Sequence, residues 1–307
     1  MSEQARGPRL GIDLGGTKIE IVAVGADGGV LHRERVATPR GEYEGTIAAI
    51  AGLVGRTEGR VGRASSIGIG TPGSTSPATG LHRNSNSTCL NGRPLRADLE
   101  RALGRGIAFT NDANCFALSE ATSGAAAGKR MVFGAILGTG VGGGVVIDGK
   151  AIHGHNGIGG EWGHSPLSWR PGFGSQPAWE SRSCYCGQRG CREQFLSGPA
   201  VEAEYAQLSG VGRPLAEIAQ RTRLGDAFAA ATIERYMIRL ATSLADVVNL
   251  LDPDCIVLGG GVSNLEILYP EIERRVAPLV FSDTFTTPIL RAALGDSSGV
   301  FGAALLA

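Results

Sequence analysis

A repeated pattern of strands and glycine turns constrains the fold of this chain more than any other feature. Residues 9–24 predict a buried strand, a turn at Gly15 and Gly16, and a returning strand. Residues 131–148 predict the same order around a turn over 138–144. Both halves of the chain open in the same way, so we infer an internal duplication. The repeated pattern is stronger evidence for this fold than either turn would be alone.

The rest of the chain predicts a mixed α/β fold. Apolar residues at helical spacing alternate with short apolar runs that end in turn residues, and no low-complexity linker divides the chain. The first half takes the order β-β-β-α-β-α-β. The expected strands cover 9–14, 19–24, 31–36, 65–70, 106–110, 131–137, 145–148, 255–258 and 288–293, and the expected helices cover 43–54, 94–103, 113–121, 198–208, 214–222, 230–251, 263–276 and the C-terminal residues.

The charge balance argues against several classes of partner. Lys plus Arg and Asp plus Glu both number 29, so no strong field would attract nucleic acid or an acidic membrane. The sequence has no signal peptide and no run of about 18 apolar residues. We therefore expect a cytoplasmic protein that binds a small molecule and has no nucleic-acid or membrane partner.

One histidine and three cysteines have the ligand count and spacing of a structural zinc site. Three of the six cysteines fall within eight positions, a pattern that favours a metal over disulfides in a reducing compartment. Free core thiols are the alternative, but Gly187 and Gly190 supply the turns that a metal-binding loop needs. Two carboxylates, Glu161 and Glu193, flank the group in sequence. The four expected ligands are His164, Cys184, Cys186 and Cys191.

Asp112 follows a predicted strand and precedes a predicted helix. Catalytic groups commonly lie at such positions in α/β folds. Aspartate is also a frequent N-cap residue, and on the residues alone this remains the simpler interpretation. The role of Asp112 therefore depends on the motifs around it.

Three glycine turns, beginning at Gly15, Gly138 and Gly259, each end a core strand. Backbone N–H groups in such turns attract phosphate oxygens, and three of them favour a nucleotide over simple hairpins. The chain has no G-x-x-x-x-G-K-[ST] motif. Residues 138–143 fit G-x-G-x-x-G, but a strand and not a helix is expected to follow, which argues against a dinucleotide fold.

Six motifs occur in an order that resembles bacterial sugar kinases of the ROK (repressor, ORF, kinase) family, along the chain from Leu10 to its end. Residues 84–92 and 295–299 are most similar to the fructokinase or manno(fructo)kinase branch, and N-acetylglucosamine kinases are close relatives. The motifs are DLGGTK at 13–18, ND at 111–112, LGTGVG at 137–142, EWGH at 161–164, CYCGQRGCRE at 184–193 and GGG at 259–261.

The resemblance implies an actin-like fold, which duplicates a ribonuclease H-like α/β unit and binds ATP and sugar in a cleft between two lobes. We expect an N-terminal lobe over 1–112, completed by the C-terminal helix at 294–307. The C-terminal lobe would cover 113–293 and contain the zinc-binding segment 164–191. The resemblance also implies a homodimer.

The family's functional residues match positions of this chain one by one. Asp112 matches the catalytic base, and Asp13 matches the residue associated with Mg²⁺. The sugar-binding positions are Asn111, Asp112, Glu161, His164 and Glu193, where one nitrogen of His164 binds zinc and the other can face the sugar. The ATP-binding positions are Asp13, Gly15, Gly16, Thr17, Lys18, Gly138, Thr139, Gly140, Gly259, Gly260 and Gly261.

The implied function is transfer of the γ-phosphate of ATP to the 6-hydroxyl of a hexose, with fructose expected first and mannose second. N-acetylglucosamine or glucose is the alternative within the same class. A sugar-responsive regulator is a remote alternative, since the first strand begins near Leu10 and leaves no room for a DNA-binding domain. A non-catalytic sugar-binding module is disfavoured because the acidic and glycine motifs are intact.

Two features depart from the family pattern or stay outside it. Arg192 stands where the family more often has an apolar residue, which affects the packing behind Glu193. The loop at 165–183 is long and could be a lid or a subunit contact. We expect the three tryptophans, at 162, 169 and 179, to pack in loops, and His32, His82, His153 and His155 to be surface or loop residues.

Overall fold

The computed structural model describes residues 7–168, 182–295 and 298–306. Contacts divide the chain into a first unit, residues 1–124, 144–160 and 294–307, and a second unit, residues 125–143 and 161–293. The lobe boundaries expected from the sequence, with a division after residue 112, stay a prediction. Most of the 165–183 loop, including Trp169, Phe173 and Trp179, lies outside the described residues.

A five-stranded sheet forms the centre of the first unit. Its strand order is β3-β2-β1-β4-β7, with β1 to β3 antiparallel and β4 and β7 parallel to β1. The three consecutive strands expected at the start of the chain are thereby confirmed. The strands are β1 (Arg9–Leu14), β2 (Lys18–Val24), β3 (Val30–Ala37), β4 (Ser66–Thr71) and β7 (Ala108–Asn111).

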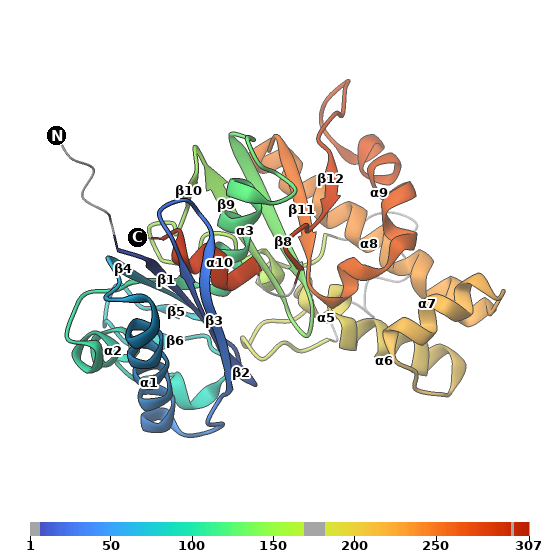
Figure 1. Cartoon of the computed structure of the whole chain (residues 1–307). Helices are drawn as coiled ribbons and strands as arrows, with labels where there is room; N and C mark the ends of the chain where they lie inside the picture. Colours follow the sequence, from blue (N-terminus) through green and yellow to red (C-terminus); the bar gives the residue numbers. More distant parts are fainter. Residues whose placement is uncertain (1–6, 169–181, 296–297, 307) are drawn as a thin grey trace. The chain divides into compact units, whose positions relative to one another are not determined.

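Alternation along β2 explains why helices cover both faces of this sheet. Ile19 and Ile21 join the core beneath α1 (Tyr43–Val61) and α2 (Leu95–Leu103), whereas Val22 and Val24 pack with α10 (Ser298–Ala304) on the other face. The helix α3 (Asp112–Ser123) packs beside α10, and Figure 1 shows the two pairs of helices on either side of the sheet.

Smaller elements of the first unit include one that we did not expect. A two-stranded sheet pairs β5 (Ser74–Thr75) with β6 (His82–Arg83), and η1 (Thr88–Leu90) follows it. His82 is only 1% exposed, and its Nε2 lies 2.8 Å from the carbonyl oxygen of Pro72. The expectation that His82 is a surface or loop residue is therefore wrong, because this polar contact lets the ring sit in the interior.

The second sheet repeats the arrangement of the first. Its order is β10-β9-β8-β11-β12, with β8, β11 and β12 parallel. Three strands consecutive in sequence are thus followed by two parallel strands in both sheets, as a duplication predicts. The strands are β8 (Met131–Leu137), β9 (Val141–Ile147), β10 (Lys150–Ala151), β11 (Cys255–Gly259) and β12 (Ile289–Arg291).

The strand β9 begins earlier than expected. We assigned 138–144 to the turn, but β9 starts at Val141, so Gly142, Gly143 and Gly144 belong to the strand. Extended backbone is open to glycine, and a side chain at Gly144 would place its Cβ 2.5 Å from the carbonyl oxygen of Ala113. The strand after the G-x-G-x-x-G match is confirmed, as is its hairpin with β10.

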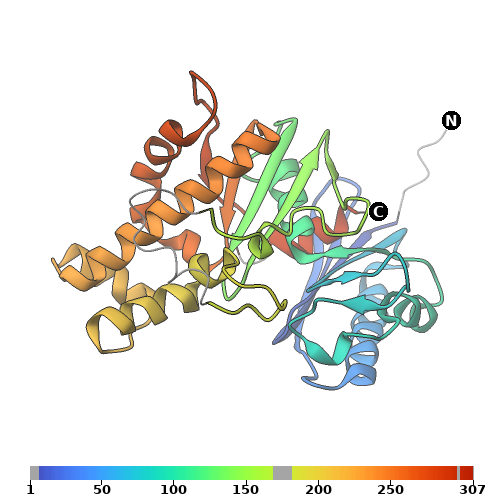
Figure 2. The same ribbon diagram turned by 180° about the vertical axis from the view of Figure 1, so that it is seen from behind.

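Helices of the second unit gather around the long helix α8 (Ala227–Leu251), which α6, α7 and α9 contact, as Figure 2 shows. Asp226 caps α8, since its side chain accepts from the N–H groups of Phe228 and Ala229. The remaining elements are α5 (Glu193–Leu196), α6 (Gly198–Ser209), α7 (Leu215–Arg223), α9 (Tyr269–Val276), η2 (Trp162–His164), η3 (Gly261–Asn264), η4 (Glu266–Leu268) and η5 (Ala277–Leu279).

The single helix expected at 263–276 is wrong. Two short 3₁₀ helices, η3 and η4, occupy its first part, and α9 begins only at Tyr269. Pro270 lies in the first turn of α9, where its missing N–H costs nothing, so it marks a helix start and not a helix interior. No helix in the described ranges has the length and apolar character that would let it cross a membrane.

Candidate functional site

Three parallel strands of the first unit end beside one another. Asp13 on β1 pairs with Gly70 on β4, and Thr71 on β4 pairs with Asn111 on β7. Adjacent strands lie about 4.8 Å apart, so Asp13 and the start of α3 are separated by about 10 Å across the end of β4. Asp13 and Asp112, two of the predicted site residues, therefore belong to one edge of one sheet.

The start of α3 separates the two roles considered for Asp112. Asn111 is the N-cap residue, because its side chain accepts from the backbone N–H of Asn114 at 2.8 Å. Asp112 is the first helical residue and is exposed, and one of its carboxylate oxygens accepts from the N–H of Ala113 at 2.8 Å. The simple N-cap interpretation of Asp112 is therefore wrong.

The thiol of Cys115 lies near both Asp13 and Asp112. Its thiol is fully buried one turn into α3, and the pKa of the thiol is raised by burial first and then by the charges of Asp13 and Asp112. Both carboxylates thus act electrostatically on the same buried group. The structure brings Asp13 and Asp112 into one neighbourhood of the first unit.

The first glycine turn joins β1 to β2. Gly15 donates its N–H to the carbonyl oxygen of Lys18 at 2.9 Å, and its own carbonyl oxygen accepts from the hydroxyl of Thr38 at 2.7 Å. Gly16 and Thr17 lie exposed at the tip. A fixed turn with an exposed backbone tip is suited to approach by a phosphate group.

The other two glycine turns are neighbours in the second unit, because β8 and β11 are adjacent parallel strands. Gly138 donates to the carbonyl oxygen of Gly140 at 2.9 Å. Gly260 has a φ of 82°, and a Cβ there would lie 2.4 Å from the carbonyl oxygen of Leu137. Glycine is required at 260 both for its positive φ and for this close approach. The predicted phosphate motif at 138–140 and the predicted adenosine motif at 259–261 therefore lie side by side.

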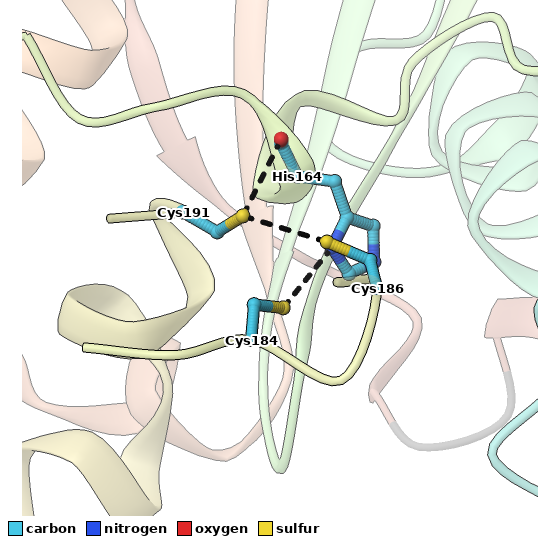
Figure 3. A group of neighbouring side chains, drawn as sticks. All are labelled: His164, Cys184, Cys186 and Cys191. Atoms are coloured by element: carbon cyan, nitrogen blue, oxygen red, sulfur yellow. Dashed lines mark hydrogen bonds between the residues drawn. The ribbon is translucent and has the colours of Figure 1, made fainter. Parts of the chain in front are cut away.

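The four predicted metal ligands form a cluster in the second unit. Their ligand atoms all lie within 4.8 Å of one another, with 3.6 Å between the sulfurs of Cys186 and Cys191 and 3.6 Å from the sulfur of Cys184 to Nδ1 of His164. Figure 3 shows the three sulfurs gathered beside the imidazole ring. Zn–S bonds of about 2.3 Å at tetrahedral angles would place two sulfurs about 3.8 Å apart. The donor set therefore fits zinc.

The backbone holds this cluster in place. Cys184 donates to the carbonyl oxygen of Gln188 at 2.9 Å, and Gly187 donates back to that of Cys184 at 3.0 Å. Gly187 and Gly190 have φ values of 87° and 70°, which confirms the turns expected at these positions. An isolated bridge between Pro166 and Cys191 joins the histidine segment to the cysteine segment.

The second ring nitrogen of His164 has a partner that the sequence did not predict. Its Nε2 lies 3.0 Å from the hydroxyl of Tyr185, and the two rings meet edge to face at 5.1 Å. Tyr185 is 63% exposed. The resemblance assigned this nitrogen to the sugar, so a sugar hydroxyl would share it with Tyr185 or replace that contact.

Glu193 joins the cysteine segment to the second glycine turn. It is the first residue of α5 and is buried, and its Oε2 accepts from the backbone N–H of Val141 at 3.0 Å. A Cβ at Gly140 would lie 2.6 Å from the same oxygen. Glu161 precedes η2 and accepts from the N–H of His164 through its carbonyl oxygen. The contact between Glu193 and Val141 was not predicted.

Trp162 confirms the loop-packing interpretation for one of the three tryptophans. Its side chain is buried, its Nε1 donates to the carbonyl oxygen of Gly142 at 2.7 Å, and its ring meets Phe133 edge to face. These contacts fix the segment that carries Glu161 and His164. Among the predicted sugar ligands, Asn111 and Asp112 belong to the first unit, and Glu161, His164 and Glu193 belong to the second.

Known proteins match this chain along almost its whole length. The profile of the ROK family matches residues 9–307. An N-acetyl-D-glucosamine kinase from Photobacterium profundum is 40% identical over 96% of this chain and 98% of that protein. An N-acetyl-D-glucosamine kinase from Vibrio cholerae is 39% identical over the same shares of the two chains.

Solved structures give the same result. A ROK hexokinase from Thermus thermophilus is 32% identical, covers 98% of this chain and 97% of that chain, and has a TM-score of 0.86. A ROK family glucokinase from Streptomyces griseus, in complex with glucose and AMPPNP, is 29% identical over 98% and 99% of the two chains, with a TM-score of 0.77. The duplicated, actin-like α/β fold expected from the sequence is confirmed.

Proposed function

The chain belongs to the ROK family, and from this premise we propose that it is a kinase that transfers the γ-phosphate of ATP to the 6-hydroxyl of N-acetyl-D-glucosamine. The identity of 40% with an N-acetyl-D-glucosamine kinase, over 96% of the chain, supports this sugar. The fructose and mannose expectation has no support among the relatives reported above. The alternative that the sequence left open therefore becomes the first choice.

The observation that carries the chemistry is the position of Asp112. A sugar hydroxyl is a weak nucleophile, and a carboxylate within hydrogen-bond reach orients it and accepts its proton during phosphoryl transfer. Asp112 is exposed at the start of α3 and is not the N-cap residue, which is compatible with contact between its carboxylate and a sugar hydroxyl. We assign it the role of general base.

The glycine turns supply the ATP contacts in this proposal. The tip at Gly16 and Thr17 and the paired turns at Gly138 and Gly260 present backbone to phosphate and adenosine. Asp13 offers the hard oxygen that Mg²⁺ prefers. When bound, Mg²⁺ neutralises charge on the phosphates. Thr139, Gly140, Gly259, Gly261, Gly15 and Lys18 complete the proposed ATP-binding set.

We assign sugar recognition to carboxylates, which accept hydrogen bonds from the sugar hydroxyls, and to amide and imidazole groups, which can accept or donate them. Glu161, His164 and Glu193 are proposed to select the sugar, and Asn111 is proposed to add an amide contact. Zinc is proposed as a structural ion, since four protein ligands leave no open position for catalysis. Its role would be to hold the side chains of His164 and Glu193 in fixed positions relative to each other.

A coupled assay of ADP release tests the proposal. N-acetylglucosamine, glucose, fructose and mannose are compared under identical conditions, and the phosphorylated position of the product is read by NMR. We expect the highest kcat/KM with N-acetylglucosamine and phosphate on the 6-hydroxyl. A higher value with fructose would restore the first expectation, and no turnover with any sugar would reject the kinase assignment.

Glucose is the second candidate substrate. The likeness to the Thermus thermophilus hexokinase, at 32% identity and a TM-score of 0.86, favours it as a competitor. The two sugars differ only at carbon 2, where one carries an acetamido group and the other a hydroxyl. The ratio of their kcat/KM values decides between them, since a site that hydrogen-bonds the amide would reject the hydroxyl analogue.

A further inference from the structure

Arg192 is buried between a predicted zinc ligand and a predicted sugar ligand. The residue is only 7% exposed, although arginine is almost never buried without a partner. The partner is Asp246 on α8, whose Oδ2 accepts from Nη2 of Arg192 at 2.6 Å. The hydroxyl of Ser168 donates to the same oxygen at 2.7 Å. A hydrogen-bonded ion pair thus holds the buried guanidinium of Arg192 against α8.

The same residue also contacts the histidine-bearing segment. The backbone N–H of Arg192 donates to the carbonyl oxygen of Ser165 at 3.0 Å, and its guanidinium lies 5.9 Å from the ring centre of Trp162. Arg192 therefore links α8, the segment at 162–168 and the cysteine segment. All of these lie in the second unit.

Glu193 follows Arg192 directly, so a contact that holds the backbone at Arg192 also limits where the side chain of Glu193 can point. The buried carboxylate of Glu193 accepts from the N–H of Val141 at 3.0 Å, and this contact depends on where the start of α5 is held. Apolar packing would hold that start without fixing its rotation. The charge-assisted hydrogen bond from Nη2 of Arg192 to Oδ2 of Asp246 ties that start to α8 at a defined distance.

We propose that Arg192 and Asp246 are positioning residues that set the orientation of the Glu193 carboxylate and, through it, the affinity for the sugar. The part that concerns sugar affinity rests on the proposed function. The part that concerns Glu193 does not, because the Val141 N–H reports its orientation without any substrate.

Hydrogen exchange of the Val141 amide is the first test. Arg192→Leu and Asp246→Asn should each speed this exchange about tenfold or more, since the amide loses its acceptor. Glu234→Gln is the matched control: Glu234 also lies on α8 and pairs with Arg275 at 2.7 Å, but it is 52% exposed. The control should leave Val141 exchange unchanged.

Kinetics and metal content form the second test. The sugar KM should rise about tenfold in Arg192→Leu and Asp246→Asn, while the KM for ATP rises less, because the displaced carboxylate is a proposed sugar ligand and meets the second glycine turn only from the side of Glu193. Arg192→Lys, which keeps the charge, should recover part of the affinity. Zinc content measured by mass spectrometry should match the wild type, which separates misplacement of Glu193 from loss of the metal.

Three results separate the proposals. Unchanged Val141 exchange in folded Arg192→Leu and Asp246→Asn variants would overturn the positioning role. Faster exchange with an unchanged sugar KM would overturn its link to affinity. If the wild type phosphorylates none of the sugars, the proposed function fails, while the exchange experiment still decides whether the pair orients Glu193. Should Arg192→Leu not fold, Asp246→Asn and Arg192→Lys carry the same comparison.

Discussion

Asp13 on β1 lies directly opposite Glu20 on β2 in an antiparallel pair, so two acidic side chains share one face of the first sheet. Glu20 is fully buried and pairs with Arg33 and Arg35. The pKa of Asp13 is raised to about 6, first by burial and then by the charge of Glu20, whereas Lys18 and Arg35 act in the opposite direction. The protein therefore keeps a carboxylate that a nearby cation would stabilise.

We expect Asp13→Asn to stabilise the protein without nucleotide or magnesium by about 1–3 kcal/mol near neutral pH. The carboxyl of Asp13 binds its proton more tightly in the folded state than in the unfolded state. Its contribution to stability is therefore present at low pH and is lost as pH rises from about 4 to above 6. Urea unfolding of both proteins across this window measures the difference, and a pH-independent difference would contradict the prediction.

Asp112→Asn should lower kcat at least about a hundredfold while the sugar KM changes little, because the base is lost and the hydrogen-bonding shape remains. Stability should be unchanged, since Asn111 caps α3. Asn111→Ala is the matched variant for the helix and should cost about 1 kcal/mol of unfolding free energy. Near-native kcat in Asp112→Asn would reject the general-base assignment.

Cys186→Ser tests the metal. Cys186 is exposed and its sulfur lies 3.6 Å from that of Cys191, so the variant should lose zinc without creating a cavity. We expect a lower melting temperature and a higher sugar KM, because the loop before Glu193 loosens, with the KM for ATP little changed. Cys89→Ser, outside the cluster, is the control. Full activity in a zinc-free protein would defeat the claim.

The sequence predicted the parts of this molecule that depend on local spacing. The three glycine turns and the His164 and cysteine cluster are visible in runs of a few residues, because turn chemistry and metal ligation impose short patterns. Contacts between distant residues leave no such pattern. Glu193 meets Val141 across 52 positions and Arg192 meets Asp246 across 54 positions. Only folding brings them together.

Errors in element bounds have the same kind of cause. The glycines after Gly138 looked like one long turn, but β9 begins at Val141 because pairing in the sheet overrides the low strand propensity of glycine. Apolar spacing over 263–276 suggested one helix, but Pro270 sets the start of α9. The N-cap alternative for Asp112 failed because Asn111, one residue earlier, has the same capping chemistry.

Alanine substitutions at Gly68 on β4 and at Gly55 in α1 distinguish the effect of close packing from the effect of glycine's backbone flexibility. A Cβ there would lie 1.8 Å from the carbonyl oxygen of Ala303 on α10, whereas a Cβ at Gly55, inside α1, would meet nothing within 4 Å. We expect Gly68→Ala to cost at least about 2 kcal/mol of unfolding free energy, because α10 must move from the sheet.

Gly55→Ala should instead stabilise the protein by up to about 1 kcal/mol, since alanine is the better helix former in an open position. Denaturant unfolding of the two variants measures opposite signs from the same chemical change. Equal effects at both positions would show that α10 does not lie against β4 in solution. If Gly68→Ala keeps its stability while the amide exchange of α10 speeds up, the helix has moved at little cost, and the close packing of β4 and α10 is weaker than the 1.8 Å approach implies.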